Sequence, residues 1–320
     1  MVVWEKFKKT LFSCNLIRPV DRILLAVSGG PDSICLLHLF YRLRKRYPNL
    51  WLEVAYINHG LRPQEIENEI KLITDYKEKY ELPFWERKIN IKDTESLGLE
   101  ASARKARYES LLRLAKIRNI NKIATGHNLD DQVETIIFNL LRGSGPEGVV
   151  GMPINRELIS GINLIRPLIK ISRNEIKDYL NKNNLKYCND SSNKLLIFTR
   201  NRIRHKLVPE LEKINPGFKE HLVNLSYWSE IKERYFERIV NKIERELVSD
   251  NRQKKINLDL TQILKYNTYI QYKLLRSLLI KFGRQKVYSK VINQILYLIS
   301  LGRNKNKKRV YTSKNLEIWL

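Results

Sequence analysis

The sequence predicts an α/β protein with a doubly wound, mostly parallel sheet and a smaller basic, helix-rich carboxy-terminal domain. Two observations favour this fold class. From Arg22 to about Ile171, short β-branched runs alternate with longer amphipathic stretches, which is typical of a parallel sheet covered by helices. Beyond Gly217 the alternation stops, and apolar residues recur at helical spacing within a strongly basic stretch.

The alternation of β-branched and amphipathic runs predicts the strands and helices in order along the chain. The expected strands are Ile23–Val27, Leu52–Ile57, Phe84–Ile89 and Lys122–Thr125. The expected helices begin near Ser33, Pro63, Glu100 and Leu129. Ligands of such folds bind beyond the carboxyl ends of the strands. The loops after Val27, Ile57 and Thr125 are therefore expected to carry the chemistry.

The run Asn215-Pro216-Gly217 is expected to divide the chain into two domains. Residues 1–216 would form the catalytic domain. Residues 217–320 would form a long linker helix, indicated by an apolar stripe from Leu225 to Leu247, and a small basic domain.

The charge balance predicts a polyanionic partner. The 320 residues include 59 Lys and Arg against 34 Asp and Glu, a formal net charge of +25. The stretch His221–Leu320 alone has 21 basic against 8 acidic residues, a balance of +13. Nucleic acid is favoured over membrane, because no apolar run is long enough to span a bilayer and no secretory signal is recognisable. We expect a cytoplasmic location, or the plastid stroma for a plastid-encoded chain.

A glycine-rich loop after the first strand predicts a phosphate site. Ser28-Gly29-Gly30-Pro31-Asp32-Ser33 opens a helix, so its NH groups and the positive helix end would converge on one anion. The same residues would suit a plain turn, but their position after a strand favours the phosphate site. The loop is neither a Walker loop nor a GxGxxG dinucleotide loop. A carboxylate repels phosphate, so we predict that Asp32 binds Mg²⁺.

Two further motifs fall at this expected ligand edge. In Leu99–Tyr108, Arg104 and Arg107 lie three apart on one helix face and could neutralise charge on a transferring phosphorus, although exposed arginines are more often merely solvated. In Ala124–Thr135, Asp131 and Glu134 could bind an amino group or a metal beside His127. These acids could equally serve only the helix dipole.

The third motif, Thr199–Lys206 with Pro209 following, would by itself be a basic surface segment. Taken with the others, it carries a resemblance. The SGGxDS loop resembles that of the N-type ATP pyrophosphatase (PP-loop) superfamily, whose members split ATP into AMP and pyrophosphate to adenylate a substrate. The motifs LEAxARxxRY, GHNxDDxxET and RNxIRHxxxPxL resemble the tRNA(Ile)-lysidine synthetase family, in consistent order up to about Leu211.

The resemblance implies an activity. Members join L-lysine to C2 of the wobble cytidine of an isoleucine tRNA with a CAU anticodon, through an adenylated base, and release AMP and pyrophosphate. It implies ATP and Mg²⁺ as cofactors and the tRNA and L-lysine as partners, and it leaves a homodimer open.

The resemblance also implies residue roles. The residues expected to bind ATP are Ser28, Gly29, Gly30, Pro31, Asp32, Ser33 and His127. Asp131 and Glu134 would bind lysine, and Asp32 would bind Mg²⁺. The expected catalytic residues are Asp32, Arg107, Asp131 and Arg204. How Arg107, His127 and Arg204 divide their roles stays open.

Three alternatives remain at this stage. A tRNA thiolase of the same superfamily generally needs paired cysteines or an iron–sulfur cluster, whereas Cys14, Cys35 and Cys188 are widely spaced. A non-catalytic RNA-binding protein would not need the intact loop and acids. An ammonia ligase or amidotransferase would not explain the charge.

Overall fold

The protein is described from a computed structural model. The described residues are 2–58, 60, 63–89, 99–188, 199–247, 260–281, 289–300, 309–313 and 316–319. The chain forms two compact units: the first comprises Met1–Asn139 and Gly151–Asn224, and the second comprises Leu140–Val150 and Leu225–Leu320. The boundary between a catalytic and a basic domain, expected between residues 216 and 217, stays a prediction. No pattern in the sequence indicated that residues 140–150 belong to the second unit.

The first unit is built on a six-stranded sheet with the order β3-β2-β1-β4-β6-β5. Its strands are β1 (Arg22–Ala26), β2 (Trp51–Asn58), β3 (Phe84–Lys88), β4 (Lys122–Thr125), β5 (Asn155–Ile159) and β6 (Ile162–Ile165). All neighbours pair in parallel except β5 and β6, which form an antiparallel hairpin at one edge. The mostly parallel sheet is thus confirmed, and the hairpin is an addition that the sequence pattern did not indicate.

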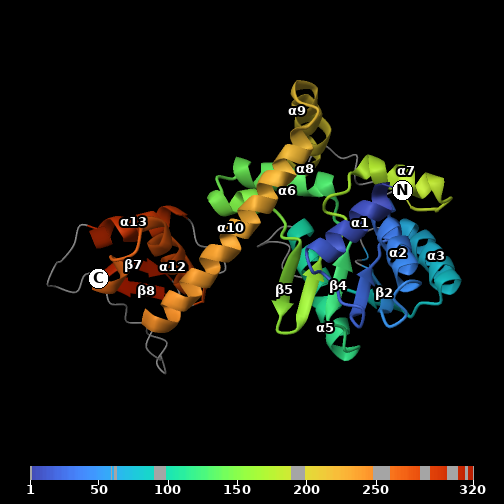
Figure 1. Cartoon of the computed structure of the whole chain (residues 1–320), viewed down its shortest axis with the longest axis horizontal. Coiled ribbons are helices and arrows are strands. Elements are labelled where there is room, and N and C mark those ends of the chain that lie inside the picture. The colour runs from blue at the N-terminus through green and yellow to red at the C-terminus, as the bar shows by residue number, and fades with distance from the viewer. Residues whose placement is uncertain are drawn as a thin grey trace. The chain divides into compact units, whose positions relative to one another are not determined.

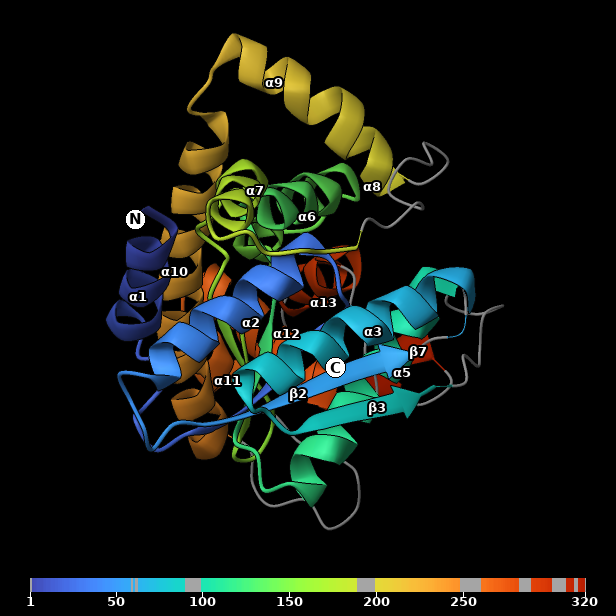
Figure 2. The ribbon, with the colours of Figure 1, turned by 90° about the vertical axis from the view of Figure 1, so that its right-hand side faces the viewer.

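Helices cover both faces of this sheet (Figures 1 and 2). The helices are α1 (Val2–Ser13), α2 (Pro31–Arg44), α3 (Pro63–Tyr80), α5 (Leu99–Ile117), α6 (Leu129–Leu141), α7 (Arg173–Lys182), α8 (Thr199–Arg202) and α9 (Val208–Ile214). Between α8 and α9 lies η3 (Ile203–Leu207), a π-helical turn. In both views α2 and α3 lie side by side.

The alternation of side chains along β1 explains the two layers. Leu25 faces a core shared with α2 and α3, where Leu37 and Ile73 are buried. Leu24 faces the opposite core, where it packs with Leu111 of α5. Because successive strand residues point to opposite faces, one apolar run supplies both cores.

A capping box fixes the start of α7. The Ser172 hydroxyl accepts a hydrogen bond from the Glu175 backbone NH at 3.2 Å, and the Glu175 carboxylate accepts from the Ser172 NH at 2.9 Å. Two otherwise unpaired helix NH groups are satisfied in this way. The box sets the position of Arg173, the first residue of the helix.

The second unit is rich in helix, as expected. Its elements are η1 (Pro146–Val150), most of α10 (Phe218–Leu247), α11 (Leu260–Ile263), α12 (Thr268–Lys281), α13 (Ser289–Ser300), β7 (Arg309–Ser313) and β8 (Leu316–Trp319). Ile243 of the predicted apolar stripe, and Val240 beside that stripe, are buried against Leu274 and Leu278 of α12. Among the described residues, no helix is both long enough and apolar enough to cross a membrane.

Candidate active site

The predicted phosphate loop joins β1 to α2 and is held by its own polar groups. Gly29 has φ +79°, a conformation that favours glycine, and Gly30 is the N-cap of α2. Ser33 accepts a hydrogen bond from the NH of Ser28 at 3.2 Å, and its hydroxyl donates to the Gly30 carbonyl at 2.9 Å. The loop therefore lies at the amino end of α2, where the helix dipole favours an anion.

A second loop packs directly on the first. Gly126, after β4, approaches so closely that a Cβ added there would lie 3.0 Å from the carbonyl carbon of Asp32 and 3.1 Å from the NH nitrogen of Ser33. Such distances leave no room for a side chain between two backbones. Gly126 thus brings the loops after two adjacent strands, β1 and β4, together.

Asn128 joins the acids of the two loops. Its amide donates to Oδ1 of Asp32 at 2.9 Å, and its side-chain oxygen accepts from the Asp131 NH at 3.0 Å. Its own NH donates to Oδ2 of Asp131 at 3.2 Å. Burial, and then the charge of Asp131, raise the pKa of Asp32 to about 6. Burial, opposed by Arg173 and reinforced by Glu134, raises the pKa of Asp131.

The structure also brings Asp131 and Glu134 together, one helical turn apart on α6. Glu134 is 2% exposed and accepts two hydrogen bonds from Arg204 of η3, at 2.7 Å from Nε and 2.9 Å from Nη2. Arg200 of α8 lies 3.6 Å from the same carboxylate. Arg173 of α7 lies 3.1 Å from Asp131 and 3.6 Å from Glu134. Three guanidinium groups thus surround the two acids.

His127 lies between Gly126 and Asn128, and its Nδ1 is 2.8 Å from the Thr125 hydroxyl. Burial, followed by the charges of Arg166 and Arg107, lowers its pKa well below the usual range. The imidazole is therefore neutral near pH 7. Arg107 contributes to this positive field from α5.

Several residues at the site had no predicted role. Asn128 and Arg200 lay inside motifs of the sequence, and a purely local signal could have identified Asn128 as the N-cap of α6. Gly126 also lay inside a motif, but its close approach to another loop leaves no local mark. Arg173 and Arg166 follow the edge hairpin, and the sequence offered nothing to connect them with α6.

Arg166 is 2% exposed, follows β6 and donates to the Pro153 carbonyl. Burial, the largest cause, lowers its pKa. Among the described residues no acid lies within ion-pair distance of it, and its Nε has no hydrogen-bond partner. This buried cation adds to the positive field around His127.

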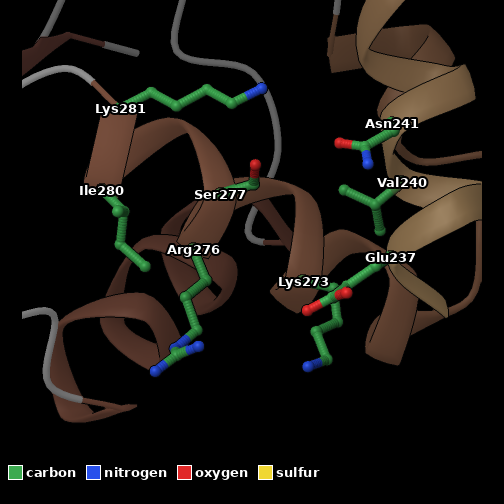
Figure 3. Close-up of a pocket in the computed structure, with 8 residues that line it drawn as sticks. All are labelled: Glu237, Val240, Asn241, Lys273, Arg276, Ser277, Ile280 and Lys281. Atoms are coloured by element: carbon green, nitrogen blue, oxygen red, sulfur yellow. The ribbon is translucent and has the colours of Figure 1, made fainter. Parts of the chain in front are cut away.

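A pocket of about 210 Å³ lies in the second unit, between α10 and α12 (Figure 3). Its lining residues are Glu237, Val240, Asn241, Lys273, Arg276, Ser277, Ile280 and Lys281. None of them was predicted as a site residue. The pocket is part of the basic unit and does not belong to the constellation around Asp32.

Comparisons with known proteins agree with the loop and the sheet. The PP-loop domain family matches residues 3–211. A tRNA(Ile)-lysidine synthase of Petrotoga mobilis is 31% identical over 296 residues, which cover 88% of each chain. Another from Clostridium tetani is 38% identical over 207 residues, covering 64% of this chain and 43% of that protein. This chain therefore spans less than half the length of the Clostridium tetani relative.

Among solved structures, a U34-tRNA thiolase from Methanococcus maripaludis superposes with a TM-score of 0.61 and 21% identity, covering 71% of this chain and 78% of that one. That similarity concerns the fold alone. The family match covers residues 3–211, which include most of the first unit, and the Petrotoga mobilis relative is similar along 88% of its length. The chain therefore belongs to the tRNA(Ile)-lysidine synthase family of PP-loop proteins.

Proposed function

We propose that this protein ligates L-lysine to C2 of the wobble cytidine in an isoleucine tRNA with a CAU anticodon, consuming ATP and releasing AMP and pyrophosphate. One observation carries the proposal. The phosphate loop after β1 and the acids Asp131 and Glu134 after β4 meet at the carboxyl ends of adjacent strands, joined through Asn128. In this proposal the loop binds ATP and the two acids bind the amine, so that the two substrates adjoin one another, as two consecutive transfers require.

In the first transfer, the C2 oxygen of cytidine attacks the α-phosphorus of ATP, and pyrophosphate leaves. The loop NH groups and the amino end of α2 are suited to hold the pyrophosphate. The arginines around the site, together with Arg107, oppose the negative charge that grows on the phosphorus. Neutral His127 can donate or accept a hydrogen bond without adding charge.

The donor set fits a magnesium ion at Asp32. The charge of Asp131 disfavours ionisation of the half-buried Asp32, and Oδ2 of Asp32 accepts no hydrogen bond among the described residues. A divalent cation bound by Asp32 would relieve this repulsion, and Mg²⁺ is commonly held by one or two carboxylates plus phosphate oxygens. When bound, it would supply charge neutralisation on the ATP phosphates.

In the second transfer, the lysine side-chain amine attacks C2, and AMP leaves with the former C2 oxygen. The ammonium must first lose a proton. Asp131 is suited to accept it, because burial raises the pKa of its carboxyl group and so makes the carboxylate a stronger base. Glu134 would hold the amine in place through the same helix face.

The test is pyrophosphate release from ATP and Mg²⁺ by the full chain, with the CAU-anticodon tRNA and with lysine each present or absent, in parallel with incorporation of labelled lysine. Release that needs both substrates, with label entering the tRNA, is the expected result. A transcript with the wobble cytidine replaced by uridine is the control. Release that needs tRNA but ignores lysine would instead indicate another base modification, and no release would favour a binding protein.

A further inference from the structure

The acids of the lysine site are occupied by the protein's own arginines. Both oxygens of Glu134 accept from Arg204, and Asp131 lies 3.1 Å from Arg173 and 3.5 Å from Arg204. Glu134 is almost entirely buried. An incoming ammonium would therefore compete with a bidentate, charge-assisted pair, which is among the stronger polar contacts in proteins.

The pairing of Glu134 limits how Arg204 can move. Two carboxylates, those of Asp131 and Glu134, face three guanidinium groups, those of Arg173, Arg200 and Arg204. Withdrawal of Arg204 would take away both hydrogen bonds that it donates to the buried Glu134 carboxylate, which is unfavourable unless another cation replaces it. One ammonium ion would be such a replacement. A lysine side chain and Arg204 are thus alternative partners of Glu134.

The backbone that carries Arg204 suits a change of position. Arg204 lies in η3, a π-helical turn between α8 and α9. Such turns are rare and frequently occur at functional sites. Its neighbour Ile203 is buried, so the turn is anchored on one side while Arg204 is only half-buried.

We propose that Arg204 blocks the lysine site until a substrate phosphate group draws its guanidinium away from Glu134, so that lysine binds only after the phosphate-bearing substrate. A guanidinium group binds phosphate in the same two-point geometry that it uses with a carboxylate, so the exchange preserves its contacts. The phosphate can come from ATP or from the RNA backbone. The inference rests on the proposed function, since it concerns the order in which that reaction's substrates bind.

This order has a chemical consequence. A lysine amine admitted before the base is activated would sit beside ATP and could attack the α-phosphorus itself, forming an unwanted phosphoramidate. If the effective phosphate belongs to the RNA backbone, lysine enters only once the tRNA is bound, so the cytidine is placed beside ATP before the amine is. The arginine would thus protect the reaction's specificity as well as hold charge.

The test measures lysine affinity by calorimetry with the full chain in four states: alone, with a non-hydrolysable ATP analogue and Mg²⁺, with the CAU-anticodon tRNA, and with both. We expect the dissociation constant for lysine to fall at least tenfold in the state that supplies the effective phosphate, and the single-ligand states identify its source. Equal affinity in all four states, with analogue and tRNA binding verified, would overturn the ordering while leaving the proposed function intact. Absence of lysine binding in every state would overturn both.

A variant and a matched control sharpen the test. Arg204→Gln should bind lysine in the free protein at least tenfold more tightly than the wild type, because Glu134 has lost its competing partner. Arg202→Gln removes the same charge two residues earlier, from an exposed side chain, and should keep the wild-type dependence on the other substrates. Lysine affinity of free Arg204→Gln equal to that of the wild type, with folding verified by circular dichroism, would contradict the proposal. The four-state measurement on the wild type decides the matter if the variant does not fold.

Discussion

At the scale of single residues, the site combines groups that destabilise the folded protein with groups that compensate for them. Asp32 is half-buried and near Asp131, and its pKa is raised to about 6. A carboxyl group with a raised folded-state pKa binds protons more strongly in the folded than in the unfolded chain. Its ionisation therefore costs stability as the pH rises from about 4 to about 6, and that cost stays constant above this range.

Substitution Asp32→Asn should remove this cost. We expect the variant to gain about 1–3 kcal/mol in the free energy of unfolding relative to the wild type at pH 7.5, and less at pH 4. Asn can still accept from Asn128, so the loop contact survives. Pyrophosphate release should be abolished, since Mg²⁺ loses its carboxylate. Urea unfolding at both pH values measures the difference, and a stability difference independent of pH would contradict the assignment.

Gly126 offers a second residue-scale prediction. Because an added Cβ would lie 3.0 Å from backbone of the phosphate loop, Gly126→Ala should displace that loop and weaken ATP binding about tenfold or more, with a stability loss of about 1–3 kcal/mol. The control is Gly161→Ala, where φ is +82° but no atom lies within 4 Å of the added carbon. That variant should lose stability and keep its ATP affinity. Fluorescent ATP-analogue titration separates the two.

At the scale of elements, much of the fold followed from local patterns, and the remainder depends on contacts between distant segments. Strands β1, β2 and β4 were predictable because each is a short, mostly apolar run that ends at a polar loop. The hairpin β5–β6 was not, because Asn155–Ile159 carries exposed polar residues that resemble a loop. The start of α7 carries a capping box, which marks a helix but gives no indication that Arg173 reaches Asp131.

The same capping box allows a prediction for α7. Ser172→Ala should lower the free energy of unfolding by about 1 kcal/mol, because the Glu175 NH loses its acceptor. Since Arg173 begins this helix, its guanidinium should also be less well placed, and the KM for lysine should change while the KM for ATP does not. Ser172→Thr keeps a capping hydroxyl and should resemble the wild type. Equal changes in both KM values would show that the whole sheet edge had loosened.

At the candidate site, too, the individual residues could be predicted from the sequence but their contacts could not. Asp32, Asp131, Glu134 and Arg204 were identified from motifs, and the structure places these four side chains in one network with Asn128. The motifs did not indicate which charged side chain pairs with which. Ion pairing between α6 and η3 depends on how α6, α7 and η3 pack, and no periodicity in the sequence reports it.

At the scale of the whole molecule, the formal net charge of +25 is the feature that should most affect the binding of a polyanion such as RNA. If the partner is RNA, affinity should fall steeply with salt, because each phosphate contact releases counterions. We expect the tRNA dissociation constant to rise at least tenfold between about 50 and about 200 mM potassium chloride. ATP affinity should change much less over the same range. Filter binding at several salt concentrations gives the slope, and a slope near zero would be incompatible with a phosphate-directed surface.

The segment Leu140–Val150 is synthesised well before the residues that it packs against. It directly follows the buried, acid-bearing part of α6, yet it packs with the second unit, where Glu147 lies 3.0 Å from Lys273 and the Val150 carbonyl accepts from Ser226. On the ribosome, residues 140–150 emerge long before Lys273. The turn η1 can therefore reach its final packing only once translation has delivered α12, so nascent chains halted before that point should remain open to proteases between residues 140 and 150.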